Sequence, residues 1–243
     1  MSGIAAIIEA RMDSSRLPGK VLLEVMGKPL LGLLIERIQK VSKINKIIVA
    51  TTVNPKDQII EEYCQENKIL CFRGSEEDVM GRVLGAAINN DVGTIVQITG
   101  DCPLIDPQII SQILNCYLNN DYDYVGNSHI RSYPDGMDVQ VFSKNILENS
   151  YNITRDKLDR EHVSLHIRRT STYSKFNIVA PSNLYYPKLG LTLDDHKDYL
   201  LIKEIFESFQ TNNFSLIEIL DLLNNKKPEL KSLNKDVKRK GDN

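Results

Sequence analysis

The stretch that most constrains this chain runs from Ile4 to Lys20 and reads IAAIIEARMDSSRLPGK. It begins with a brief, isoleucine-rich apolar run, which is typical of a buried β-strand. The run stops at a loop that carries two serines and the cations Arg11, Arg16 and Lys20. Backbone N–H groups and hydroxyls can bind phosphate oxygens, while arginine and lysine side chains neutralise them. The stretch therefore favours a polyphosphate-binding loop over a solvated basic surface loop.

The pattern that follows alternates strands and helices at short intervals. Apolar runs predict strands at residues 4–9, 46–52, 69–72 and 94–99, separated by helices at 29–41, 54–63, 75–90 and 106–118. We expect Ser75 to cap the helix at 75–90. This β-α-β-α order predicts an α/β fold with a Rossmann-like, mostly parallel sheet and helices on both faces.

The rhythm changes between residues 126 and 187, where the connections are longer. Strands are expected at 121–125, 137–142 and 176–180, and one polar-faced helix at 158–169. An insertion or dimerisation arm fits this region better than regular α/β structure. The sheet pattern then returns with a strand at 189–194, followed by a helix. We expect a single domain over residues 1–223 and a flexible basic tail over 224–243.

The composition fits a soluble globular protein. The formal net charge is −2 over 243 residues, so the chain as a whole has no nucleic-acid footprint. No apolar stretch approaches membrane-spanning length, and we expect no membrane association. The four cysteines form no C-x-x-C pair and no zinc-like spacing, so we expect reduced thiols in a cytoplasmic protein.

Two aspartates directly follow predicted strands: Asp101 after TIVQITG and Asp194 after LGLTL. Ligands collect at the carboxyl ends of strands in open parallel sheets. Mg²⁺ takes one or two protein carboxylates together with phosphate oxygens, so the basic loop and these aspartates predict a magnesium–nucleotide site. Taken singly, Asp101 could be a turn residue and Asp194 a helix N-cap, a role that Asp195 could equally fill.

These residues resemble the cytidylyltransferases that activate acidic sugars as CMP-sugars, including the Kdo and acylneuraminate enzymes, with the closest likeness to the spore-coat polysaccharide branch. The family signature A-R-x-G-S-x-R-L-P-G-K stands here at residues 10–20, and G-D-x-P stands at 100–103. The third block is Leu193-Asp194 followed by Asp198-Tyr199, and branch-like segments occur at 73–78 and 134–139. One departure is Asp13, which replaces the usual glycine of the phosphate loop.

The resemblance implies a nucleotide-diphospho-sugar transferase fold and the site residues of a CMP transfer. A sugar hydroxyl would attack the α-phosphorus of CTP in line, and pyrophosphate would leave. The implied catalytic residues are Arg11, Arg16, Lys20 and Asp101, with Asp101 and Asp194 on Mg²⁺. The implied nucleotide-binding residues are Ala10, Arg11, Ser14, Arg16, Lys20, Arg73, Ser75, Asp78 and Gln97. The implied acceptor-binding residues are Asp135, Gly136, Asp138, Glu161 and His162.

Other functional classes fit this sequence less well. Spacing excludes a Walker P-loop, and no G-x-G-x-x-G follows a strand as in a dehydrogenase. An enzyme that makes nucleoside-diphosphate sugars from sugar 1-phosphates usually opens with a G-x-G-T-R loop, which is missing here. A non-catalytic nucleotide-binding scaffold is the alternative from another class. Family likeness and common oligomer symmetry further predict a two-fold homodimer through residues 126–187.

Overall fold

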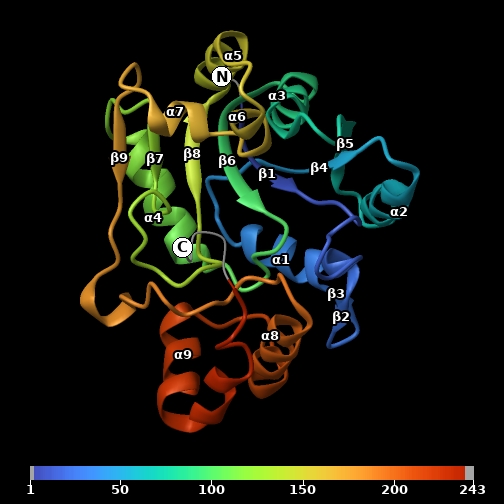
Figure 1. Cartoon of the computed structure of the whole chain (residues 1–243), viewed down its shortest axis with the longest axis vertical. Coiled ribbons are helices and arrows are strands. Elements are labelled where there is room, and N and C mark those ends of the chain that lie inside the picture. The colour runs from blue at the N-terminus through green and yellow to red at the C-terminus, as the bar shows by residue number, and fades with distance from the viewer. Residues whose placement is uncertain (1–2, 239–243) are drawn as a thin grey trace.

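Seven strands form one mixed sheet in the order β5-β4-β1-β6-β8-β7-β9 (Figure 1). The computed structural model of the chain describes residues 3–238. β8 is antiparallel to both of its neighbours, and all other pairs are parallel. The strands are β1 (Gly3–Glu9), β4 (Lys46–Thr52), β5 (Leu70–Gly74), β6 (Val92–Thr99), β7 (Tyr124–Gly126), β8 (Gln140–Ser143) and β9 (Lys175–Asn177), with a separate hairpin of β2 (Glu24–Val25) and β3 (Lys28–Pro29).

Helices cover both faces of the sheet, as the alternating pattern predicted. None of the helices within residues 3–238 has the length and apolar character that crossing a membrane requires. They are α1 (Leu30–Ile38), α2 (Gln58–Glu66), α3 (Val79–Asn89), α4 (Pro107–Leu118), α5 (Lys144–Ile153), α6 (Lys157–Glu161), α7 (Leu165–Arg169), α8 (His196–Phe209) and α9 (Leu216–Asp221), with short turns η1 (Lys20–Leu22), η2 (Pro55–Asp57), η3 (Ser182–Leu184), η4 (Leu222–Lys226) and η5 (Pro228–Ser232).

β1 is central because both of its faces are buried. Ala5 and Ile7 pack in a core with residues of α3 and α5, while Ala6 and Ile8 pack on the opposite side with α1, α4 and α8. A strand that is buried on both faces reads as a continuous apolar run rather than an alternating one. This burial explains the run that opens the chain and confirms the doubly wound α/β fold.

The segment expected as one helix at 158–169 is two short helices, so that prediction was wrong. Val163 lies between α6 and α7 with φ of 48°, a left-handed conformation that an α-helix cannot contain. The residue is fully buried in the core beneath the sheet. The left-handed backbone at Val163 therefore separates α6 from α7.

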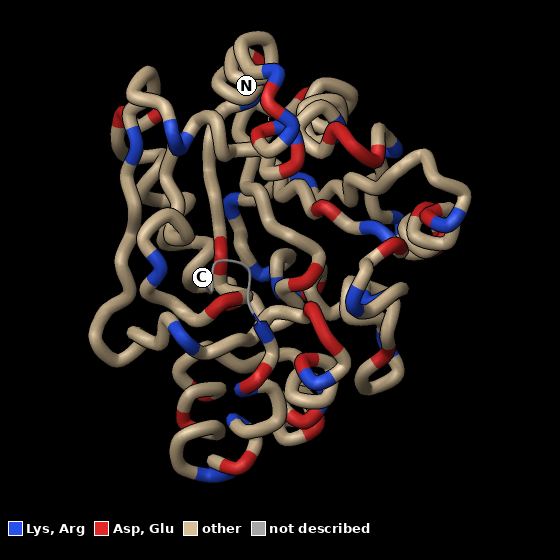
Figure 2. Tube along the Cα trace, viewed as in Figure 1, with Lys and Arg blue, Asp and Glu red and all other residues tan. Residues whose placement is uncertain are grey.

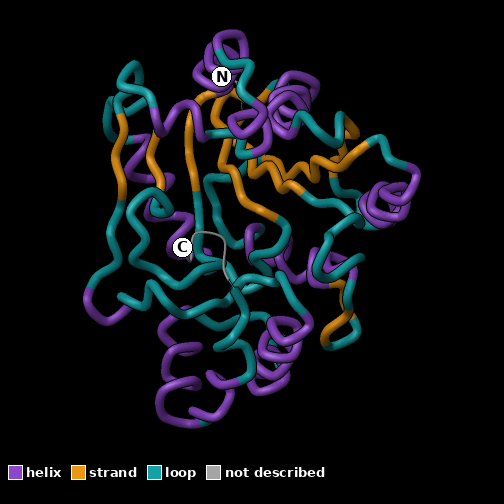
Figure 3. Tube along the Cα trace, in the orientation of Figure 1, coloured by secondary structure: helices purple, strands orange, loops and turns teal. Residues whose placement is uncertain are grey.

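The prediction of a strand at residues 189–194 was also wrong. This segment is a loop leading into α8 (Figure 3), with one isolated bridge between Gly190 and Asp135. Leu191 and Leu193 are fully buried in the core. Their alternation with polar residues reflects packing of a buried loop and not pairing in the sheet.

The helix expected to be capped by Ser75 begins later. The N-cap of α3 is Asp78, whose side chain accepts a hydrogen bond from the N–H of Gly81 at 2.8 Å. The Ser75 hydroxyl instead accepts from the N–H of Asp78 at 3.1 Å. Residues 75–78 therefore form a loop and not the first turn of the helix.

The strands β7, β8 and β9, which lie in or next to the region 126–187, extend the main sheet.

The basic segment after residue 223 differs from the flexible tail that composition predicted, as far as Lys238. It continues η4, forms η5 and buries Leu230 and Asn234. A few leucines spaced among lysines are enough to fasten this segment to the core, which composition alone hides. Residues 239–243 of the expected tail lie outside the described residues.

Candidate active site

Lys20 is the centre of an ion-pair cluster at the carboxyl ends of β1 and β6. Its Nζ lies 3.0 Å from Oδ2 of Asp101 and 3.0 Å from Oδ1 of Asp194. It also donates to the carbonyl oxygen of Leu193 at 2.6 Å. Because one ammonium group contacts both carboxylates, the two aspartates lie close enough to share one cation. The sequence prediction that Lys20, Asp101 and Asp194 meet is confirmed.

Two backbone contacts bring the aspartates together. Gly100 donates its N–H to the carbonyl of Glu9 at 2.9 Å, and a Cβ at this glycine would lie 2.8 Å from the same oxygen. Only glycine permits this close approach between the ends of β1 and β6. The N–H of Leu193 donates to the carbonyl of Asp101 at 2.8 Å. Asp194 therefore reaches the site without belonging to a strand.

The phosphate loop closes on itself through Met12 and Gly19. Gly19 has φ of 72° and donates its N–H to the carbonyl of Met12 at 2.8 Å. The N–H of Met12 is held in turn by Oδ1 of Asp57 at 2.6 Å. Asp13, the departure from the family pattern, pairs with Lys56 at 3.1 Å. Its charge therefore points away from the cleft beside Lys20.

A cleft of about 730 Å³ opens beside this cluster. Its walls come from the ends of β1 and β6, the phosphate loop, the loop before α3, and α6. Basic and acidic residues are interspersed along the chain (Figure 2). The cleft is likewise lined by both cations and carboxylates. The predicted site residues that line it are Ala10, Arg11, Ser14, Arg16, Lys20, Ser75, Asp78, Asp101, Glu161, His162 and Asp194.

Burial and charge act in opposite directions on the central groups. Burial works to raise the pKa of Asp101, but the charge of Lys20 and hydrogen bonds from Thr99 and Lys20 hold that pKa below its ordinary value. Burial works to lower the pKa of Lys20, but the two carboxylates raise it above its ordinary value. Arg16 adds a second cation, with Nη2 at 2.9 Å from Oδ2 of Asp194. Lys20 and Asp101 are therefore both charged at neutral pH.

Two predicted nucleotide-binding residues do not line the cleft. Arg73 donates to the carbonyls of Thr52 and Asn54, each at 2.9 Å, and pairs with Glu61 at 3.0 Å. Gln97 is 3% exposed, and its Nε2 donates to Oε1 of Glu9 at 2.6 Å. Arg73 on β5 thus bonds to the end of β4 and to α2. Gln97 bonds to the side chain of Glu9 and does not line the cleft.

Three predicted acceptor-binding residues also stand apart from the walls of the cleft. Asp135 pairs with Arg131 at 3.2 Å, and Gly136 has φ of 101° in a turn whose Cβ would meet the backbone of Leu191 at 2.7 Å. Burial, reinforced by the charge of Asp135, raises the pKa of Asp138 to about 6. The charge of Asp101 also acts on Asp138, so this residue is near the cluster although it does not line the cleft.

Sequence reasoning missed Glu9, Arg82 and Lys157, which all line the cleft. Burial raises the pKa of Glu9 to about 7, against smaller opposing effects of the Gln97 hydrogen bond and the Arg82 charge. Glu9 ends β1, so the strand-end rule that selected Asp101 could also have found it. Arg82 is 3% exposed, and within the described chain its Nε has no hydrogen-bond partner. A lone arginine in the apolar pattern of α3 was its only signal.

The donor set at Asp101 and Asp194 suits a divalent ion that arrives with phosphate. Two hard carboxylates face a cationic loop, and Mg²⁺ commonly takes one or two carboxylates plus phosphate oxygens and waters. No group of three or more His, Cys, Asp and Glu side chains within residues 3–238 could hold a metal ion by itself. The residues therefore fit an ion carried by a nucleotide better than one caged by protein alone.

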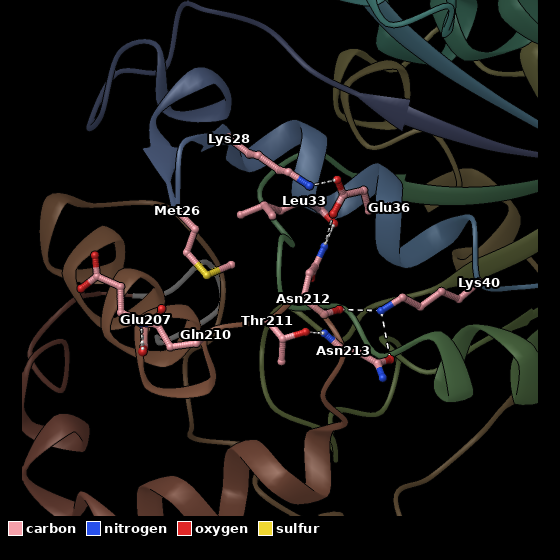
Figure 4. Close-up of a pocket in the computed structure, with 10 residues that line it drawn as sticks. All are labelled: Met26, Lys28, Leu33, Glu36, Lys40, Glu207, Gln210, Thr211, Asn212 and Asn213. Atoms are coloured by element: carbon pink, nitrogen blue, oxygen red, sulfur yellow. Dashed lines mark hydrogen bonds and ion pairs between the residues drawn. The ribbon is translucent and has the colours of Figure 1, made fainter.

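A second cavity, of about 800 Å³, lies between α1 and the end of α8. Figure 4 shows that Lys28, Glu36 and Lys40, three of the charged residues that line it, are engaged within the protein. Lys28 pairs with Glu36 at 2.5 Å, and Lys40 donates to the carbonyl of Asn212 at 2.5 Å. These groups are already paired, and the basic loop of residues 11–20 does not border this cavity.

A doubly wound sheet with a cationic loop and two aspartates gathered at the carboxyl ends of β1 and β6 is the arrangement expected of a nucleotidyltransferase. Comparison with known families gives the particular one: the cytidylyltransferase family model matches residues 5–237. The chain belongs to the cytidylyltransferase family and is an enzyme of the nucleotidyltransferase class.

Individual relatives support the same assignment. The chain is 31% identical over 231 residues to the spore coat polysaccharide biosynthesis protein SpsF of Bacillus subtilis, covering 92% of this chain and 95% of SpsF. It is similar to a cytidylyltransferase from Leptospira borgpetersenii, with a TM-score of 0.91, 30% identity, and coverage of 98% and 100%. A CMP:2-keto-3-deoxy-manno-octonic acid synthetase complexed with CTP has the same fold, with a TM-score of 0.65, 17% identity, and coverage of 86% and 100%.

Proposed function

We propose that the enzyme transfers CMP from CTP to a hydroxyl of an acidic sugar or related acceptor, with release of pyrophosphate, in the biosynthesis of surface polysaccharides or other glycans. The observation that carries the proposal is the convergence of Lys20 on Asp101 and Asp194 beside the basic loop. Membership of the cytidylyltransferase family supports CTP as the donor, and the name of SpsF supports a polysaccharide pathway.

The triphosphate would lie against the loop of Arg11, Ser14, Arg16 and Lys20. Asp101 and Asp194 would hold Mg²⁺, which when bound neutralises charge on the phosphate oxygens. The chain's own contribution is positioning, because Arg16 and Lys20 fix the phosphates for in-line attack and spread the developing charge. Since Lys20 and the metal ion compete for the same carboxylate oxygens, we expect Lys20 to turn toward the triphosphate.

The nucleoside would occupy the part of the cleft beneath the loop before α3. Ala10, Ser75 and Asp78 line this end, and Arg82 lies under the loop and donates to the carbonyl of Ser75. Glu9 forms the floor and is held in place by Gln97. Arg73 would act only by holding β5 against α2, since its guanidinium is engaged there.

The acceptor would bind at the end formed by α6, where Glu161 and His162 line the cleft. The cations on this helix that line the cleft are Lys157 and Arg160. Arg11, Arg16 and Lys20 pair with carboxylates, and Arg160 pairs with Asp78. Across residues 3–238 no such partner is found for Lys157, which leaves it available for an acidic group of the acceptor.

Asp138 stays a candidate acceptor contact because its charge interacts with that of Asp101. Asp135 and Gly136 would shape the turn behind it.

We further propose a homodimer in the cytoplasm. Support for the dimer comes from exposed apolar side chains at and near the edge strand β9, namely Ile130, Phe176, Val179 and Tyr185. Support for the cytoplasm comes from the four cysteines, all within the described residues and all free thiols.

Pyrophosphate release tests this function. The enzyme is incubated with Mg²⁺, each nucleoside triphosphate in turn, and acidic sugars or sugar 1-phosphates. We expect release with CTP and an acidic sugar bearing a free hydroxyl. Release only with sugar 1-phosphates would replace the proposal with synthesis of a nucleoside-diphosphate sugar. Tight nucleotide binding without turnover for any acceptor would indicate a non-catalytic scaffold.

A further inference from the structure

The C-terminal segment 228–238 is fastened to the backbone that carries Asp194. After α9 the chain returns toward the carboxyl ends of β1 and β6 (Figure 1). Asn234 in this segment is 5% exposed, and its Nδ2 donates to the carbonyl of Gly190 at 3.0 Å and to Oδ1 of Asp198 at 2.7 Å. Both acceptors flank the loop 190–195, so one buried amide holds the two sides of that loop.

Asp198 passes this contact on to Asp194. Its other oxygen, Oδ2, accepts hydrogen bonds from the N–H groups of Asp194 and Asp195, each at 3.0 Å. Asp198 is completely buried, and Asp195 caps α8 in the same turn. The backbone of Asp194 is therefore set by a carboxylate whose orientation depends on Asn234.

The same segment also reaches Asp194 from its other side. Nη1 of Arg16 donates to the carbonyl of Lys238 at 2.9 Å, while Nη2 of Arg16 lies 2.9 Å from Oδ2 of Asp194. An ion pair of 2.5 Å between Lys197 and Asp236 ties the segment to α8. Residues 234–238 thus contact both the backbone support and the side-chain partner of Asp194.

We propose that Asn234 is a positioning residue for the metal–nucleotide site, acting through Asp198 on Asp194. The inference rests on the proposed function, because it assumes that Asp194 binds the ion that accompanies CTP. Residues that orient a metal ligand through a hydrogen bond commonly change metal affinity by about 10- to 100-fold when they are replaced. A purely structural role would lower the melting temperature and leave metal affinity unchanged.

The test is titration of the full-length enzyme with Mn²⁺ in the presence of CTP and without acceptor, followed by electron paramagnetic resonance of free Mn²⁺. We compare the wild type with Asn234→Ala, which removes the donor, and Asn234→Asp, which keeps the shape and replaces the donor with an acceptor. The matched control is Asn224→Ala, whose side chain donates to the hydroxyl of Tyr186 in the same C-terminal region. Circular dichroism confirms that each variant is folded.

We expect the dissociation constant for Mn²⁺ to rise about tenfold in Asn234→Ala and at least as much in Asn234→Asp. Asn224→Ala should bind Mn²⁺ within about twofold of the wild type, since the Asn224 side chain bonds to Tyr186 and Lys231 and not to Asp198 or Gly190. Unchanged Mn²⁺ binding in both folded Asn234 variants overturns the inference and leaves the proposed function standing. A wild type that binds no Mn²⁺ with CTP overturns the proposed function, and the inference with it.

Discussion

The two halves of the sheet differ in how clearly the local sequence pattern predicts their strands and helices. In the half formed by β5, β4, β1 and β6, the strands are parallel, and α2, α3 and α4 closely follow β4, β5 and β6 in the chain. In the half formed by β8, β7 and β9, the strands have three or four residues and long irregular segments join them. The basic loop and Asp101 belong to the first half, whereas α6 lies between β8 and β9 in the second half. The sequence therefore specifies the nucleotide chemistry more clearly than the acceptor.

The largest effect is expected from Lys20→Ala at the nucleotide end. Removing this charge from between Asp101 and Asp194 takes away a fixed contact to the transferring phosphates. We expect kcat/KM for CMP transfer to fall by roughly 10²- to 10³-fold. The control is Lys56→Ala, which loses only the exposed pair with Asp13 and should stay within about twofold. A Lys20→Ala enzyme within tenfold of wild type would contradict the assignment of the nucleotide end.

A smaller effect is expected from Lys157→Ala at the acceptor end. The loss of a charged contact to an acidic acceptor should raise the KM for that acceptor about tenfold. The KM for CTP should stay within about twofold, because the phosphate loop is untouched. Lys144→Ala serves as control, since Lys144 pairs with Glu148 outside the cleft. If steady-state kinetics show that the KM for CTP rises instead, Lys157 contacts the nucleotide and α6 does not form the acceptor end.

The third effect is on the free energy of unfolding and tests Glu9 at the floor of the cleft. Glu9 has its pKa raised from 4.5 to about 7 in the folded enzyme, mainly by burial. The unfolded chain therefore ionises first as pH rises, and stability that is complete below the lower pKa is lost as pH passes through the higher one. We expect the wild type to lose at most roughly 3 kcal/mol between pH 5 and 8 relative to Glu9→Gln.

Urea unfolding of both proteins across this pH range measures the difference. Glu9→Gln keeps the shape and can still accept the hydrogen bond from Gln97, so its own stability should not show this loss. A wild type that gains stability relative to the variant as pH rises would show that Glu9 is stabilised as an anion. The floor of the cleft would then be more polar than its burial indicates.

Part of the site could be predicted because the relevant signals are local. The apolar runs of β1 and β6 fix where Lys20 and Asp101 come together. Asp194 was selected for a reason that is only partly right, since the segment before it is a buried loop and not a strand. It still arrives at the site because Leu191 and Leu193 pack into the core and the N–H of Leu193 bonds to Asp101.

The remainder depends on contacts that no local pattern contains. Lys157 lines the cleft from the first turn of α6, a short helix that ends before the left-handed Val163 and that the apolar pattern does not separate from α7. Arg73 and Gln97 have suitable chemistry, but their partners in the folded enzyme are protein groups. Asn234 bonds to a residue 36 positions away, from within a segment whose composition predicts disorder. Charge and hydropathy cannot identify such residues before the packing is known.

The most direct test of the account is a crystal of the enzyme soaked with CTP and Mn²⁺, with the ion located by its anomalous scattering. We expect one manganese ion bound by both Asp101 and Asp194, with triphosphate oxygens contacting Lys20 and Arg16. An ion bound by neither aspartate, or a triphosphate lying away from Lys20, would contradict it.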